Sequence, residues 1–169
     1  NKCRQKDTEA RWTKKHGVSH YGYKNHVNVD KKHKLIRQYA VTDAAVHDSQ
    51  VLEAVLLPAE AGREIWADSA YRSAEIETQL KAKRLHSKIH HKAARNKPLT
   101  AQQKTHNHAR SRIRARVEHV FGHQVTAMGG KLIRTIGLLR ATVKIGLKNL
   151  TYNMQRFLIL TRPRKMQGA

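Results

Sequence analysis

The chain has 169 residues, of which 34 are Lys or Arg and 12 are Asp or Glu, so its net charge is +22 before any histidine is protonated. This length suits one compact domain and is too short for two full ones. A single cysteine excludes an internal disulfide, and no apolar run approaches the roughly 18 residues of a membrane span. We therefore expect a protein of a reducing compartment, the cytoplasm.

The charge excess predicts the kind of partner. A compact chain with this much positive charge repels itself and attracts a polyanion. Nucleic acid is the commonest polyanionic partner, because each neutralised phosphate releases counterions. A structural protein of the ribosomal type and a membrane-surface protein remain as alternatives.

The first part of the chain predicts an arm followed by a hairpin. Residues 1–18 are polar and charged, which is typical of a basic N-terminal arm. They contain neither an initiator Met nor the apolar core of a signal peptide, so we expect a fragment or a processed piece. Residues 19–42 contain a run with Tyr and Val at every second position, a polar turn at 30–33 and a second β-prone run.

Alternating helices and strands follow. Asp48 or Ser49 can cap a helix that ends before Pro58. The apolar run at 64–67 predicts a buried strand that ends at Asp68. Ser73 then caps a helix over residues 74–84, and the alternation at 85–89 predicts a further short strand. This order of elements indicates a mixed α/β domain over residues 19–161.

The C-terminal half predicts an exposed basic loop and two long helices. Residues 90–112 are the most basic and least apolar part of the chain, and a helical pattern begins near Gln102. One apolar stripe of that helix consists of Ile113, Val117, Val120 and Phe121. For a last helix at 138–160 we expect a buried face made of Leu139, Val143, Leu147, Leu150, Met154 and Phe157. Residues 162–169 form a basic tail.

Asp68 is the first candidate for chemistry. An Asp at the carboxyl end of a buried strand lies at the edge of the sheet where α/β folds place their active sites. The alternative is that Asp68 only caps the helical turn that follows it.

Glu118 is the second candidate. On a helix it borders the apolar stripe, and Arg114 lies one turn before it. The alternative is a solvated Arg–Glu pair of a few tenths of a kcal/mol. Two carboxylates from distant segments, such as Asp68 and Glu118, could jointly hold Mg²⁺ or Mn²⁺, because hard cations prefer carboxylate, water and phosphate oxygens. Such ions activate a water and stabilise the leaving oxygen at a phosphodiester.

The histidines give a weaker signal. The densest group contains His90, His91, His106, His108, His119 and His123. His119 and His123 have the i, i+4 spacing of half a zinc site, but the His-Glu-x-x-His pattern is absent. We therefore interpret these histidines mostly as surface residues or residues that face nucleic acid.

Three stretches together resemble bacterial insertion-sequence transposases of the DDE type, which have a ribonuclease-H-like catalytic core. The first is ARWTKKHG at residues 10–17, followed by YGYKNH at 21–26 and VD at 29–30. The second is WADSAYRS at 66–73, and the third is RARVEHVFG at 114–122. They occur in the order typical of the family and span nearly the whole chain.

The resemblance implies roles for particular residues. Asp68 corresponds to the second catalytic Asp, Glu118 to the catalytic Glu, and Arg114 to the Arg of the Arg-x-x-x-Glu signature. Ser111 stands where that signature has a Tyr, and Val125 stands where it has a Lys. The first catalytic Asp has no counterpart at the family's position, although Asp7, Asp30, Asp43 and Asp48 are possible replacements.

We therefore expect an incomplete ribonuclease-H-like mixed sheet with flanking helices and a long C-terminal helix. The resemblance implies Mg²⁺-dependent or Mn²⁺-dependent cleavage and strand transfer during DNA transposition, and a homo-oligomer at full length. Two ligands hold a hard cation weakly, so we expect little activity from this chain alone. The main alternative is a non-enzymatic fragment that binds nucleic acid by charge. The residues expected to bind DNA are Arg110, Arg112, Arg114, Arg116, Lys92, Arg95 and Lys97.

Overall fold

The computed structural model describes residues 6–15, 17–57 and 61–162, and it confirms a mixed α/β fold with four α-helices in these residues. In chain order the elements are β1 Arg11–Lys15, β2 Val18–Val29, β3 Ile36–Asp43, the 3₁₀ helix η2 Asp48–Val51, α1 Leu52–Val55, β4 Glu64–Ile65, the 3₁₀ helix η4 Ser69–Tyr71, α2 Ala74–Ala82, β5 His86–Ser87, α3 Ala101–Thr126 and α4 Leu138–Thr161. The expected tail lies, apart from Arg162, outside the described residues.

The strands form two sheets, where the sequence predicted one mixed sheet. The first is antiparallel with the order β1-β2-β3, and the second is parallel and consists of β4 and β5. The hairpin of β2 and β3 is confirmed, with Tyr23 opposite Asp43. The prediction of an arm was wrong for Arg11–Lys15, because this segment pairs with the first half of β2 and forms β1.

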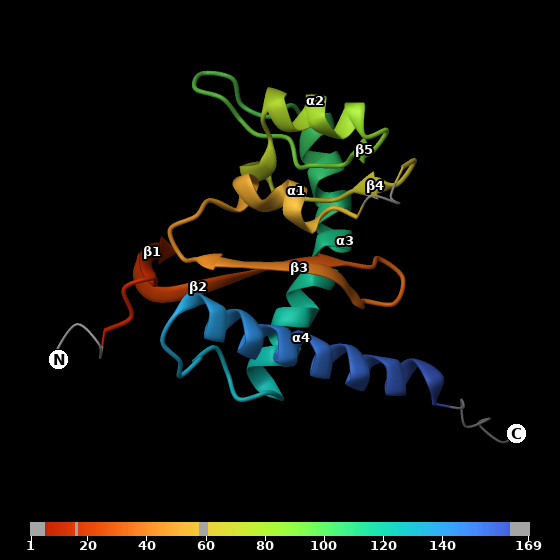
Figure 1. Ribbon diagram of the computed structural model, residues 1–169. Helices are drawn as coiled ribbons and strands as arrows, with labels where there is room; N and C mark the ends of the chain where they lie inside the picture. The colour runs from red at the N-terminus through yellow and green to blue at the C-terminus, as the bar shows by residue number, and fades with distance from the viewer. Residues whose placement is uncertain (1–5, 16, 58–60, 163–169) are drawn as a thin grey trace, which may run out of the picture.

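Both faces of the three-stranded sheet are covered, as Figure 1 shows with α1 on one side and α4 on the other. Val27 and Val29 pack against a cluster of Ile36, Val120 and Tyr152. The opposite face of β2 carries Lys24, His26 and Asn28 and is packed against η2 and α1. Lys24 donates to the Val46 carbonyl, His26 is 7% exposed, and Asn28 donates to the Val55 carbonyl.

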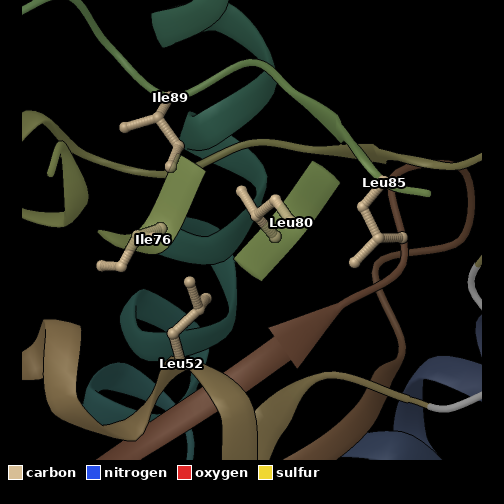
Figure 2. Packing of buried hydrophobic residues seen from close by; sticks show 5 residues of the cluster. All are labelled: Leu52, Ile76, Leu80, Leu85 and Ile89. Atoms are coloured by element: carbon tan, nitrogen blue, oxygen red, sulfur yellow. The ribbon is translucent and has the colours of Figure 1, made fainter. Parts of the chain in front are cut away.

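A second core joins α1, α2 and the parallel sheet. Its buried members are Leu52, Ile76, Leu80, Leu85 and Ile89 (Figure 2). Ser73 caps α2 as predicted, because its side chain accepts a hydrogen bond from the backbone N–H of Ile76. The predicted caps of the preceding helix were wrong: His47 caps η2, and the carboxylate of Asp48 pairs with Lys24 instead.

Helix α3 connects the two cores (Figure 1). Thr100 begins it with a capping box, in which the side chains of Thr100 and Gln103 each bond the other residue's backbone. Near its start, Asn107 bonds the backbone of His91. Near its end, Val120 is fully buried against the three-stranded sheet. The helix therefore fixes how the parallel sheet stands relative to the antiparallel one.

Helix α4 buries a different face from the one that the sequence predicted. The six residues expected to be buried are 55–78% exposed: Leu139, Val143, Leu147, Leu150, Met154 and Phe157. The buried residues are Ala141, Ile145, Asn149 and Tyr152. Gly146 faces the hydroxyl of the Tyr39 side chain so closely that a Cβ would collide with it, so a larger residue would require this partly exposed side chain to move. An exposed apolar stripe of this length is typical of an interaction surface.

Buried amides replace apolar contacts where α4 meets the sheet. The Asn149 side chain is 2% exposed. Its Oδ1 accepts hydrogen bonds from Asn25 on β2 at 2.8 Å and from Gln124 on α3 at 2.9 Å. Asn149 Nδ2 donates back to Asn25 Oδ1 at 3.1 Å. One side chain therefore links a strand and two helices.

Acidic residues before β1 hold the start of α4. Asp7 accepts a hydrogen bond from the backbone N–H of Gly137 at 3.2 Å, and Glu9 accepts one from Leu138 at 3.0 Å. Carboxylates stabilise a helix N-terminus through its partial positive charge. Tyr23 also donates to Asp7, so this part of the expected arm is bound to the domain.

Lowering the pH is expected to destabilise the fold through His26. Burial, together with the charge of Lys24, lowers the pKa of His26 below its usual value, although Asp48 opposes this. Its stabilising contribution is therefore complete above the unfolded pKa of about 6.5 and is lost as the pH falls through the lower folded value, by up to about 1.4 kcal/mol per pH unit. Urea unfolding at pH 7.5 and pH 5 measures the loss.

The matched variant is His26→Gln, which can still donate to the Thr42 hydroxyl that His26 Nε2 bonds at 2.8 Å. We expect this variant to lose less stability than the wild type between the two pH values. The exposed His20→Gln on the same strand should behave like the wild type. An equal loss in His26→Gln and in the wild type would show that His26 does not control the pH dependence.

Among the described residues, no helix is long and apolar enough to cross a membrane.

Candidate active site

Asp68 lies at the end of the parallel strand β4. Lys88 and His90 donate their backbone N–H groups to the carbonyls of Ile65 and Ala67, so the pairing of β4 with β5 continues almost to Asp68. Parallel strands end at the same edge of a sheet, where α/β proteins bind ligands. Asp68 is also the residue at which the single turn of η4 begins, but its side chain makes no capping hydrogen bond there. Its side chain is 46% exposed and therefore accessible.

Arg114 joins Asp68 to Glu118. Its Nη1 lies 3.3 Å from Asp68 Oδ2, and its Nη2 lies 3.4 Å from Glu118 Oε1. Arg114 and Glu118 are one turn apart on α3. Asp68 lies on a different segment, between β4 and η4. The two carboxylates that the sequence singled out therefore face a single guanidinium group.

The carboxylate of Asp68 is ionised at neutral pH. Partial burial acts to raise its pKa, but the Arg114 guanidinium, the Ser69 hydroxyl and the backbone N–H groups of Ser69 and Ala70 hold the pKa below its usual value. The Ser69 hydroxyl donates to Asp68 Oδ1 at 3.1 Å. Oδ2, the oxygen beside Arg114, is the one that a cation in the same place would contact.

Two residues that the sequence did not select as catalytic candidates stand beside this pair, and for one of them, His90, the interpretation as a surface residue was wrong. His90 is 9% exposed, and burial together with the charges of Arg114 and Arg110 lowers its pKa, so it is neutral at pH 7. Burial and the charges of Asp48 and Asp68 raise the pKa of Tyr71 to about 12. The position of His90 could have been found from the sequence by pairing 85–89 in parallel with 64–67, because both strands would then end at one edge.

The chain differs from the family signature at two positions, Ser111 in place of a Tyr and Val125 in place of a Lys. Ser111 lies on α3 with its Oγ 3.5 Å from His90 Nε2. It also donates to the Asn107 carbonyl. Val125, which stands at the Lys position, is 37% exposed, and it carries no charge to offer to DNA.

The four possible replacements for the first Asp have other partners. Asp7 holds the start of α4, Asp30 bonds its own hairpin turn at His33, and Asp43 accepts from the Ala45 backbone. Asp48 pairs with Lys24 and His26, and its charge, like that of Asp68, raises the pKa of Tyr71. Each of the four carboxylates therefore already has a partner in the fold.

The residues expected to bind DNA fall into two groups. Arg112 on α3 is exposed, and so are the three basic residues of the loop before it, Lys92, Arg95 and Lys97. The other three have contacts within the protein. Arg110 donates to the Ile89 carbonyl, Arg114 pairs with two carboxylates, and Arg116 has a buried Nε without a hydrogen-bond partner in the described part of the chain.

The donor chemistry at Asp68 and Glu118 suits a hard divalent cation, although the number of donors is small. Both are carboxylates, both are partly exposed, and both already share one positive group. Mg²⁺ is often held by one or two carboxylates with water completing its shell. Within residues 6–15, 17–57 and 61–162, no three His, Cys, Asp or Glu side chains gather into a metal site.

Of the histidine pair with zinc-like spacing, His123 has another partner. His123 Nε2 bonds Gln155 Oε1 at 2.7 Å, and its ring meets the edge of Tyr152. This contact joins α3 to α4.

Comparison with known proteins identifies the family of the chain. The family described as "Transposase DDE domain" matches residues 2–154. The transposase for insertion sequence element IS1106 of Neisseria meningitidis serogroup B is 33% identical over 149 residues, which cover 88% of this chain and 51% of that protein. The chain thus spans about half the length of this curated relative. No solved structure matches the chain. The chain belongs to the bacterial insertion-sequence transposases with a DDE domain.

Proposed function

We propose that this chain is part of the catalytic domain of a DNA transposase, with Asp68 and Glu118 as metal ligands. The observation that carries the proposal is the convergence of these two carboxylates, from distant segments, on Arg114 in a protein with a net charge of +22. A divalent cation bound there would supply an activated water and stabilise the leaving oxygen of a phosphodiester. The reaction would be hydrolysis at the element end, followed by attack of the freed 3′-hydroxyl on target DNA.

The residues of the chain have distinct tasks in this reaction. Asp68 and Glu118 would hold the cation. The exposed basic residues of the 90–112 segment grip the DNA backbone and fix its path past the carboxylates: Lys92, Arg95, Lys97 and Arg112. Backbone contacts position the DNA without reading its sequence, so they serve element ends and target DNA alike.

The complete site would need more than this chain provides. Two carboxylates leave most of the coordination shell of a cation to water and phosphate, and the relative is about twice as long. We propose that a third carboxylate joins Asp68 and Glu118 in the longer protein and completes a ribonuclease-H-like fold there. The protein would act on DNA in the cytoplasm as a homo-oligomer, since two element ends must be held together.

A non-catalytic fragment that binds DNA by charge is the second candidate. It is favoured by the absence, among the described residues, of three clustered metal donors. On this reading the carboxylates only fix Arg114, and the basic surface alone does the work.

Metal-dependent cleavage separates the two candidates. The chain alone and a version extended upstream to the length of its relatives are incubated with a labelled element-end duplex, with Mg²⁺ or with EDTA. We expect the extended protein to cut the element end with Mg²⁺ only, and the chain alone to bind without cutting. An extended protein that binds the duplex at low salt and never cuts it would support the fragment that binds by charge.

A further inference from the structure

We propose that Arg114 is a built-in counterion, which occupies the cation position between Asp68 and Glu118 and leaves it when a divalent ion binds. This inference rests on the proposed function, because it assumes that the two carboxylates are the metal ligands. It adds a regulated state to the site: without metal, the chain's own guanidinium closes it.

The geometry distinguishes this arrangement from an ordinary surface ion pair. Arg114 and Glu118 alone would form a typical i, i+4 pair on a helix. The guanidinium instead divides its two terminal nitrogens between carboxylates of different segments, at 3.3 and 3.4 Å. Among the described residues these are the ion pairs that Asp68 and Glu118 make. A cation that reached both oxygens would therefore have to take the place of Arg114.

The exposure of the three side chains makes this exchange feasible. The Asp68 and Glu118 side chains are 46% and 69% exposed, so water and ions can reach them, whereas the Arg114 side chain is 29% exposed. Exposed ion pairs contribute little to stability. Their distances also exceed the roughly 2.8 Å of the strongest charge-assisted hydrogen bonds. The contacts are sufficient to neutralise the carboxylates and weak enough to break.

Within the described part of the chain, the neighbouring cationic side chains are held by other partners, so none of them takes the place of Arg114 between the two carboxylates. Arg110 lies one turn before Arg114, yet it donates to the Ile89 carbonyl. Arg72 donates to the same carbonyl and pairs with Glu77. His90 is nearly buried beside the site. Arg114 is thus the group placed to exchange with a metal ion.

The exchange would also free Arg114 to bind a second partner, a DNA phosphate. While it bridges the carboxylates, it is not available to DNA, although the Arg-x-x-x-Glu signature led us to expect a DNA contact there. Once released, a long side chain on α3 can swing to a phosphate held next to the metal site. Metal binding and the engagement of DNA by Arg114 would therefore be coupled, and such coupling is reciprocal.

The test measures Mn²⁺ binding to the DNA-free chain, by the loss of the free-ion signal in electron paramagnetic resonance. We expect Arg114→Gln to bind Mn²⁺ about threefold to thirtyfold more tightly than the wild type, because two partly exposed ion pairs need not be broken. Arg112→Gln is the matched control. It removes the same charge from an exposed position on the same helix, so it reports the effect of net charge alone.

Each result decides between the two proposals. If Arg114→Gln binds Mn²⁺ no more tightly than Arg112→Gln, Arg114 does not compete with the metal, and the counterion proposal fails while the carboxylate site stands. If adding Asp68→Asn or Glu118→Gln to Arg114→Gln leaves the Mn²⁺ affinity unchanged, the metal site itself is misplaced. Absence of Mn²⁺ binding in every variant overturns the counterion proposal, whereas the metal ligands of the longer protein are tested separately by its Mg²⁺-dependent cleavage. Circular dichroism of each variant checks that α3 is intact.

Discussion

Asp68→Asn and Glu118→Gln are each expected to reduce Mg²⁺-dependent cleavage by the extended protein more than about a hundredfold. Loss of a partner that only orients a metal ligand typically costs 10–100-fold, and these substitutions remove ligands themselves. Both preserve the size of the side chain and remove its negative charge. Because the amide oxygen that remains is a poor ligand for a hard cation, the measured rate should fall while the protein still binds the duplex.

The control is Glu75→Gln on α2, an exposed carboxylate that takes no part in the ion pairs of Arg114 with Asp68 and Glu118. It should leave the rate within about twofold of the wild type, since surface substitutions have small effects. DNA affinity is measured for all variants at one salt concentration. Cleavage that survives both Asp68→Asn and Glu118→Gln would show that the carboxylates are not the metal ligands and that the site lies elsewhere.

Asn149→Ala is expected to destabilise the fold by about 2–4 kcal/mol, because it leaves one buried and one half-buried amide, Gln124 and Asn25, without their partner. Asn25 and Gln124 both donate to Asn149 Oδ1, and Asn25 also accepts from Asn149 Nδ2. A buried donor or acceptor left unsatisfied costs about 1–3 kcal/mol. The loss is measured by urea unfolding at pH 7.5.

Leu150→Ala, one residue further along α4, is the matched control for Asn149→Ala. Leu150 is 56% exposed, so its truncation should cost no more than about 0.5 kcal/mol. The experiment is run at a protein concentration where sedimentation shows a monomer, because association could bury the exposed stripe. A larger loss for Leu150→Ala than for Asn149→Ala would mean that α4 packs on its apolar stripe, as the sequence suggested.

The candidate site could be predicted from sequence where local rules apply. The apolar run before Asp68 predicted a strand that delivers the carboxylate to a sheet edge. The i, i+4 spacing of Arg114 and Glu118 predicted their contact on a helix. The ion pair of Asp68 with Arg114 and the presence of His90 beside it depend on how α3 lies against the parallel sheet. No local pattern encodes that placement.

For helix α4, the hydrophobic periodicity predicted the wrong buried face. Its largest apolar residues repeat at helical spacing, and burying them is the simplest expectation. The structure buries Ala141, Ile145, Asn149 and Tyr152 instead. A small residue, an amide and a glycine at the contact let the helix approach β3 closely and satisfy the amides of β2 and α3. Hydrophobic periodicity cannot anticipate a face that is held by hydrogen bonds across three elements.

The sequence by itself determined the kind of molecule: a basic α/β domain of the DDE transposases with two informative carboxylates, because composition, local periodicity and motif spacing are properties of short stretches of chain. Only the tertiary structure decided that Arg114 lies between Asp68 and Glu118, and that α4 packs on the face that carries Ala141, Ile145, Asn149 and Tyr152. Both depend on contacts between residues that are far apart in the chain, where geometry and the pairing of buried polar groups outweigh local preference.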